Sequence, residues 1–152
     1  MVLLDGGPLG LVVHPRPSRR FGDWAAALAA GPLEIGVPEV VHYELRRELL
    51  RLGKSQSLSR LAAFVAETGF FRTHSGVFTR AAELWAEARR LGRPTADSKA
   101  LDIDMLLCAT VQLLRESGID AVIATTNVRH LKPFVPAYEW QTLDPRSGAV
   151  TS

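Results

Sequence analysis

Short apolar runs alternate with longer amphipathic stretches along the chain. The short runs are bounded by glycine, proline and polar residues, as in buried strands, and the longer stretches repeat apolar residues at helical spacing. In chain order the pattern predicts a strand at residues 2–4, a turn at GGP, a helix at residues 19–30, a strand ending near Val37, a helix from Pro38 to Gly53, a helix from Ser55 or Ser57 to about Glu67, a strand at TGFFRT, a helix from a Ser75 cap to Gly92, a helix that opens near Asp102 and stops at Gly118, a strand at DAVIAT and a final strand at EWQTL.

Strands that alternate with helices predict an α/β fold, in which a mainly parallel sheet is covered by helices on both faces. The pattern is continuous from the first strand to the last and contains no repeats. We therefore expect one domain over residues 1–144, followed by a polar tail at residues 145–152.

Composition limits the class of protein. At 152 residues, with 47% hydrophobic and 22% charged residues, the chain is long enough to bury a proper core. No run approaches the roughly 20 apolar residues of a membrane-spanning helix. The start MVLLDGGPLG lacks the basic and long apolar regions of a signal peptide, so we expect a protein that stays in the cytoplasm. The single cysteine, Cys108, excludes an internal disulfide and a cysteine-based zinc cluster.

Charge is less decisive than composition. A net charge of +2 is too small to indicate a nucleic-acid-binding protein by itself. Arginine and lysine gather in HPRPSRR, ELRRELLRLGK and RRLGRP, which would form a surface for an anionic ligand if they shared a face, and would otherwise be ordinary solvated helix faces. Trp24, Trp85 and Trp140 are expected to pack in the core or an interface rather than to stack on bases.

Polar residues gather where the predicted strands end. Ligands of parallel α/β sheets bind outside the carboxyl ends of the strands, and the N-termini of the following helices lie at the same edge. Glu44 lies about two turns into its predicted helix and can face the same cleft. The residues that this rule places at the edge are Asp5, Asp102, Asp104, Thr125, Thr126 and Asn127.

Carboxylates brought together in one cleft repel one another and raise one another's pKa values. A divalent cation removes this conflict, and Mg²⁺ and Mn²⁺ prefer oxygen ligands together with water and substrate phosphate. Asp5, Glu44 and Asp104 come from three separate segments and have the chemistry for such a site. A metal held there would activate water and stabilise the charge of a phosphodiester under attack.

The segments VLLDGGPLG, VPEVVHYELRRELL, DIDMLLCATV and VIATTNVRHLKPF resemble the PIN-domain family in their order and at similar spacing. The resemblance covers the chain from the first strand to about Phe134. It implies a three-layer α/β/α sandwich and a ribonuclease that depends on Mg²⁺ or Mn²⁺. Members of this family are often the toxin of a bacterial toxin–antitoxin pair of the VapC type, so RNA, an antitoxin protein and a second copy of the chain are the implied partners.

Within this resemblance, the three family acids match Asp5, Glu44 and Asp104, because DMLLCATV is similar to the family sequence D-A-L-I-A-A-T-A. The threonine of the family T-x-N loop matches Thr125, and Asn127 is then the polar residue beside the metal. Asp102 is a further candidate ligand, and Thr125 and Arg47 are assigned to substrate positioning. His130 is a departure, since many family members carry Asp at this place.

Each of these residues also has a purely structural interpretation. Asp5 could end its strand in an Asx-type turn, and Glu44 could lie on the surface and pair with Arg47. Asp102 is better explained as a helix cap than as a ligand, and Asn127 could only shape its loop. His130 could be a loop residue over the substrate channel as well as a residue that weakens the metal site.

Three functions compete for the same residues. The first is an endoribonuclease in which Asp5, Glu44 and Asp104 are catalytic and hold the metal. The second is a catalytically weakened PIN-like module that binds RNA or a protein partner, and His130 motivates it. The third is a phosphatase of the haloacid-dehalogenase kind, which requires a second Asp where this chain has Gly7.

Overall fold

The computed structural model describes residues 1–93 and 102–150. At its centre is a parallel sheet with the strand order β2-β1-β3-β4. The strands are β1 (Val2–Leu4), β2 (Ile35–Gly36), β3 (Val122–Thr125) and β4 (Ala137–Glu139). The prediction of an α/β fold with a mainly parallel sheet is confirmed.

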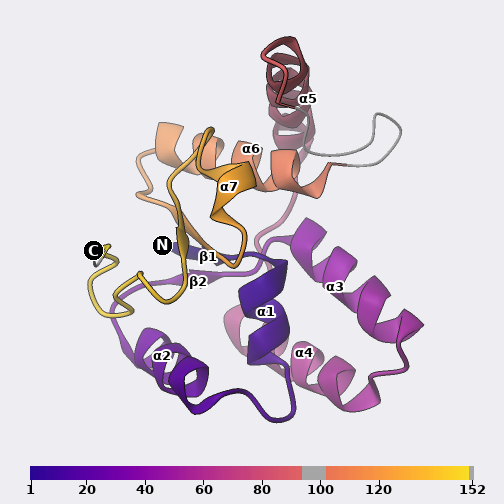
Figure 1. The fold of residues 1–152 in the computed structure, drawn as a ribbon, viewed down its shortest axis with the longest axis vertical. Coiled ribbons are helices and arrows are strands. Elements are labelled where there is room, and N and C mark those ends of the chain that lie inside the picture. The colour runs from indigo at the N-terminus through magenta and orange to yellow at the C-terminus, as the bar shows by residue number, and fades with distance from the viewer. Residues whose placement is uncertain (94–101, 151–152) are drawn as a thin grey trace.

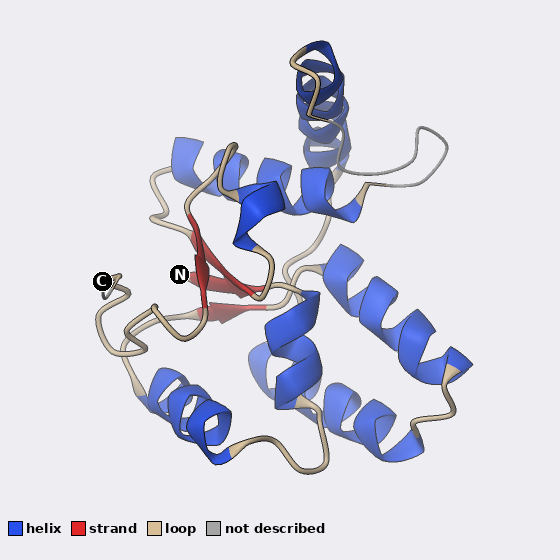
Figure 2. Ribbon diagram, in the orientation of Figure 1, coloured by secondary structure: helices blue, strands red, loops and turns tan. Residues whose placement is uncertain are grey.

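Helices lie on both sides of the sheet (Figures 1 and 2). In Figure 1, α5, α6 and α7 lie above the sheet, and α1, α2 and α4 lie below it. The helices are α1 (Gly6–Val12), α2 (Arg19–Ala30), α3 (Glu39–Arg51), α4 (Ser55–Thr68), α5 (Ser75–Arg90), α6 (Ile103–Glu116) and α7 (Val128–Leu131). In the described part of the chain, none of them is both long and apolar enough to cross a bilayer.

The central strands and α6 form the middle of the core. β1 is buried along its whole length, which fits a central strand of a parallel sheet whose two faces are both covered. α6 buries a continuous run from Met105 to Val111, because it packs on the sheet and also contacts α5 and α3. Cys108 is fully buried within this run and acts as a small apolar side chain.

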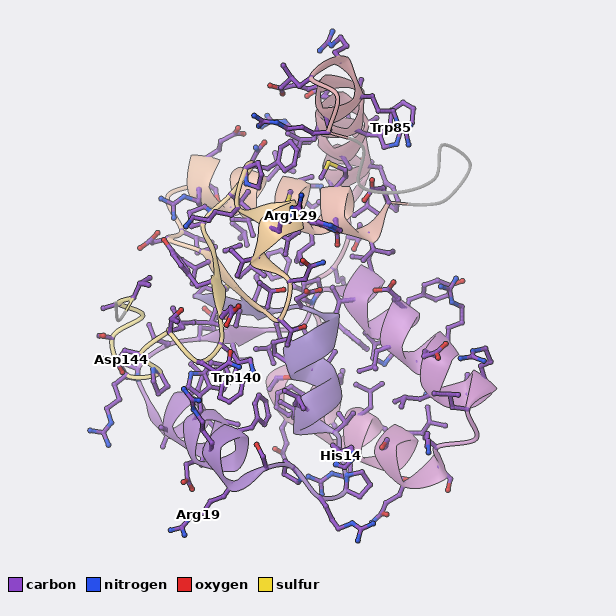
Figure 3. All side chains as sticks on the ribbon, viewed as in Figure 1. His14, Arg19, Trp85, Arg129, Trp140 and Asp144 are labelled. Carbon is purple, nitrogen blue, oxygen red and sulfur yellow. The ribbon has the colours of Figure 1, made fainter. Side chains whose placement is uncertain are left out.

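The aromatic residues of α2 and the segment after β4 form a second part of the core. Phe21, Trp24 and Trp140 contact one another with ring centroids 5.0 to 5.7 Å apart. The indole N–H of Trp24 donates a 2.9 Å hydrogen bond to the carbonyl of Leu143. Figure 3 shows Trp140 above α2, so the C-terminal segment closes this side of the molecule. Trp24 and Trp140 therefore pack in the core, as predicted.

Several details of the predicted elements are wrong. GGP is the first turn of α1 rather than a turn between elements, and α7 was not predicted. TGFFRT forms one isolated bridge, between Phe71 and Pro38, instead of a strand. The last strand precedes most of EWQTL. The N-caps of α4 and α5 are Lys54 and His74, so Ser55 and Ser75 are the first helical residues rather than caps.

Candidate functional site

Asp5 lies at the carboxyl end of β1 and is the N-cap of α1. Its Oδ1 accepts a 2.6 Å hydrogen bond from the backbone N–H of Gly6, and its Oδ2 accepts a 2.7 Å hydrogen bond from the hydroxyl of Thr125. The side chain is therefore fixed by both of its oxygens. Asp5 lies at the sheet edge as predicted, and its side chain bonds the N–H of the next residue rather than that of Gly7, which an Asx-type turn would require.

The loop after β3 supports Asp5 from the next strand. Thr125 is fully buried, and its Oγ1 accepts a 2.8 Å hydrogen bond from the backbone N–H of Asn127. Thr125 is thus enclosed behind Asp5 and holds that carboxylate by a hydrogen bond. Asn127 is the N-cap of α7, although its side chain makes no capping hydrogen bond.

Gly7 allows α1 and this loop to approach each other closely. A Cβ atom at Gly7 would lie 2.2 Å from Oγ1 of Thr126, so a side chain does not fit there. The phosphatase interpretation requires an Asp at this position, and the packing leaves no space for one. This role of Gly7 is not evident from the sequence, because a glycine in GGP indicates a turn as readily as a close contact.

The two acids at the start of α6 have different roles. Asp102 is 8% exposed and is the N-cap, since its Oδ1 accepts a 3.1 Å hydrogen bond from the N–H of Met105. This is the capping role predicted for Asp102. Asp104 lies in the first turn, and 31% of its side chain is exposed. It is the acid of this pair that is open to a ligand.

Glu44 points from α3 toward the same edge. Its Oε2 lies 3.8 Å from the Cβ position of Gly6, directly after Asp5. The carboxyl is half-buried, so it is not the ordinary surface residue of the structural interpretation. Arg47, one turn further along α3, places its guanidinium 5.6 Å from the ring centroid of Tyr43.

The pKa values of two acids report their proximity. Burial raises the pKa of Glu44, and the charges of Asp5 and Asp104 raise it further, while Arg47 opposes this. Burial also raises the pKa of Asp104, with further increases from Asp5 and Asp102. The carboxyls therefore act on one another in the way that the sequence predicted for a shared cleft.

His130 faces this group of acids. Its Nδ1 lies 3.3 Å from Oδ2 of Asp104 and 3.3 Å from Nδ2 of Asn127. A hydrogen bond to Asp104 requires the proton on Nδ1, because a carboxylate only accepts. The contact lowers the pKa of Asp104, against the effect of burial. His130 therefore contacts Asp104 while 45% of its side chain stays exposed to solvent.

The acids suit a hard divalent cation in kind, since all are oxygen donors. Burial and, after it, the neighbouring carboxylates raise the pKa values of Glu44 and Asp104, and a cation would offset that repulsion. As the side chains lie, no three acidic, histidine or cysteine residues within residues 1–93 and 102–150 form a closed set of metal ligands. Asp5, Glu44 and Asp104 thus converge on one region from three elements without being drawn together into a metal cluster.

Comparison with known proteins finds solved structures with a similar fold. No protein-family model matches the chain, and no curated protein matches it. Similar solved structures include a DNA-bound VapBC from Salmonella typhimurium, with a TM-score of 0.69 and 14% identity over 91% of this chain and 97% of that chain. A second is VapBC2 from Rickettsia felis bound to a promoter DNA fragment, with a TM-score of 0.68 and 17% identity over 92% and 99%.

A third similar structure is FitAB bound to an IR36 DNA fragment, with a TM-score of 0.69 and 17% identity over 93% of this chain and 96% of that chain. In all three cases nearly the whole of both chains superimposes. At this level of identity the likeness establishes the fold alone. The chain has a PIN-like α/β fold.

Proposed function

We propose that this protein is an endoribonuclease that hydrolyses RNA phosphodiester bonds with Mg²⁺ or Mn²⁺. The observation that carries the proposal is the convergence of Asp5, Glu44 and Asp104 at the carboxyl edge of a parallel sheet, where burial and then the charges of Asp5 and Asp104 raise the pKa of Glu44. The PIN-like fold supports it, since the acids occupy the edge at which α/β sheets bind ligands.

The residues divide into ligands and supports. Asp5, Glu44 and Asp104 would hold the ion, with Asn127 beside it and Asp102 holding the start of α6. A bound Mg²⁺ or Mn²⁺ would supply Lewis-acid activation of water and stabilise charge on the phosphoryl oxygens. Thr125 keeps Asp5 oriented, and Arg47 provides a positive charge near Glu44 for the RNA backbone.

We also propose that the protein is the toxin of a toxin–antitoxin pair, with an antitoxin protein as its partner and a homodimer as its assembly. The likeness in fold to the VapBC and FitAB complexes supports this role. A small protein encoded next to this chain should then co-purify with it and inhibit cleavage. If the adjacent gene product neither binds nor inhibits, the toxin role is wrong, although the nuclease proposal is unaffected.

A second candidate function is a catalytically weakened PIN-like module that binds RNA or a protein. The contact between His130 and Asp104 favours it, because an imidazole now lies where many PIN-domain acids lie and already pairs with one of the proposed ligands. Incubation of a mixed RNA pool with Mn²⁺, Mg²⁺ or EDTA separates the two functions. The nuclease cleaves with metal and not with EDTA, whereas the module binds RNA and leaves it intact under all three conditions.

A further inference from the structure

A pocket of about 640 Å³ lies at the other end of α1 from the acidic site. Its wall is formed by the segment after α1 and by the junction of α3 and α4, and it includes His14, Arg16, Lys54, Ser55, Gln56 and Ser57. Figure 3 shows His14 beyond the end of α1 that is remote from β1. The pocket therefore brings together two of the basic stretches of the sequence, HPRPSRR and ELRRELLRLGK.

The N-terminus of α4 opens into this pocket. Its N-cap, Lys54, makes no capping side-chain hydrogen bond. The N–H of Ser55 donates to the carbonyl of Gly53, but within the described ranges those of Gln56 and Ser57 have no acceptor. Unpaired N–H groups and the positive end of the helix dipole favour an anion at this position.

Ser57 provides an independent observation. Its residue is only 6% exposed and lines the pocket, yet its hydroxyl makes no hydrogen bond with any residue that the structure describes. Ser59 of the same helix differs, since its hydroxyl donates to the carbonyl of Ser55. A hydroxyl that belongs to a nearly buried residue, makes no protein hydrogen bond and lines a pocket is available to a ligand in that pocket.

The charge of the pocket wall favours an anionic ligand. Arg16 and Lys54 are positive, and none of the residues that line the pocket is acidic. Two backbone N–H groups, one hydroxyl and two cations match the several acceptor oxygens and the charge of a phosphate group.

We propose that this pocket binds a phosphate group, and, resting on the function proposed above, that this phosphate belongs to the backbone of the RNA substrate. α1 connects the two sites, since its N-cap is Asp5 and its C-cap, Val13, directly precedes His14. Its seven residues rise about 10 Å, so one strand of RNA can reach from the pocket to the acids. The pocket then fixes the strand at a set distance from the bond that is cut.

The first experiment uses inorganic phosphate as the probe. Phosphate is titrated into the full-length protein in EDTA while the amide signals of Gln56 and Ser57 are followed by NMR. Both should shift and saturate, and Ser57→Ala should weaken the binding about tenfold, as expected for loss of a hydrogen bond to a charged group. Lys54→Gln should weaken it about threefold, and Arg146→Gln, which removes an exposed charge on the C-terminal segment, should not. Absence of a saturable shift overturns the phosphate site.

The second experiment identifies the source of the phosphate. Binding of a short single-stranded RNA is measured in EDTA, where cleavage does not contribute. Lys54→Gln should weaken RNA binding and lower the salt dependence by about one ion, with Arg146→Gln again unchanged. If the variants weaken phosphate binding but leave RNA binding unchanged, the pocket takes an adventitious ion only and the RNA assignment is wrong. If RNA binds through the pocket but is never cut with any metal, the nuclease proposal fails while the pocket stands.

Discussion

The hydroxyl of Thr125 donates a 2.7 Å hydrogen bond to Oδ2 of Asp5, a residue 120 positions away in the sequence. Oγ1 of Thr125 also accepts a hydrogen bond from the backbone N–H of Asn127. One buried side chain thus couples the end of β1 to the loop after β3 and sets the orientation of an acid at the edge of the sheet.

Replacing Thr125 with Val should damage both stability and activity. The substitution keeps the shape but leaves the N–H of Asn127 without its acceptor, which costs about 1–3 kcal/mol, or a fall in Tm of roughly 2–10 °C for a chain of this size. Thr125→Ser keeps the hydroxyl and should retain most of the activity. Thermal unfolding and RNA cleavage measure the two effects, and a Val variant as stable and active as the wild type would show that the coupling is unimportant.

Stability without metal should depend on pH through Asp104. Its ordinary pKa is 3.8, and burial and the neighbouring acids raise it in the folded protein. The folded state therefore holds the proton more tightly, so the stabilising contribution is complete below about pH 4 and is lost as the pH rises through the raised pKa. Asp104→Asn should accordingly raise Tm in EDTA at pH 7 and have little effect at pH 4. An equal effect at both pH values would contradict this.

A divalent ion should stabilise the folded protein. Mn²⁺ at about 100 times its Kd contributes roughly 2.7 kcal/mol, which corresponds to a rise in Tm of about 5–10 °C. Differential scanning fluorimetry with Mn²⁺, Mg²⁺ and EDTA measures this shift. The rise should disappear in Asp5→Asn and persist in Asp23→Asn, since Asp23 is an exposed residue of α2 that pairs with Arg19.

His130→Asp should strengthen metal binding. The new carboxylate would lie next to Asp104, where the imidazole Nδ1 now lies 3.3 Å from Oδ2, and it would add a negative oxygen donor. The same change should lower Tm in EDTA through repulsion, and His130→Asn is the uncharged control. Calorimetric titration with Mn²⁺ tests the prediction; unchanged stoichiometry and affinity would mean that His130 does not limit the site.

The regular elements were predictable where local signals and packing agree. α6 combines an Asp102 cap, an apolar run and a terminating glycine at Gly118, so its bounds follow from the sequence. α1 does not, because GGP indicates a break, and the helix depends on the Asp5 cap and on the burial of Leu9. The last strand was predicted too late in the chain, since β4 begins at Ala137 and Trp140 lies beyond its end, where it packs against Phe21.

The site was predictable in composition but not in geometry. The rule for strand ends located Asp5 and Asp104 correctly at one edge. The direction of Glu44 depends on the rotation of α3, which the apolar residues on either side of Glu44 do not determine. The contact of His130 with Asp104 joins residues 26 positions apart through the placement of α7, and no local pattern indicates it.

The most direct test of the proposed function is the rate of RNA cleavage in Mn²⁺ for the wild type, Asp104→Asn and Asp23→Asn. We expect metal-dependent cleavage whose rate falls by about 100-fold or more in Asp104→Asn, because a ligand charge is removed at nearly constant shape. The rate should be unchanged in Asp23→Asn. Circular dichroism should show the same fold in all three proteins. Cleavage that survives in Asp104→Asn, or a folded wild type that cuts no RNA with Mn²⁺ or Mg²⁺, would contradict the assignment of these acids as a nuclease centre.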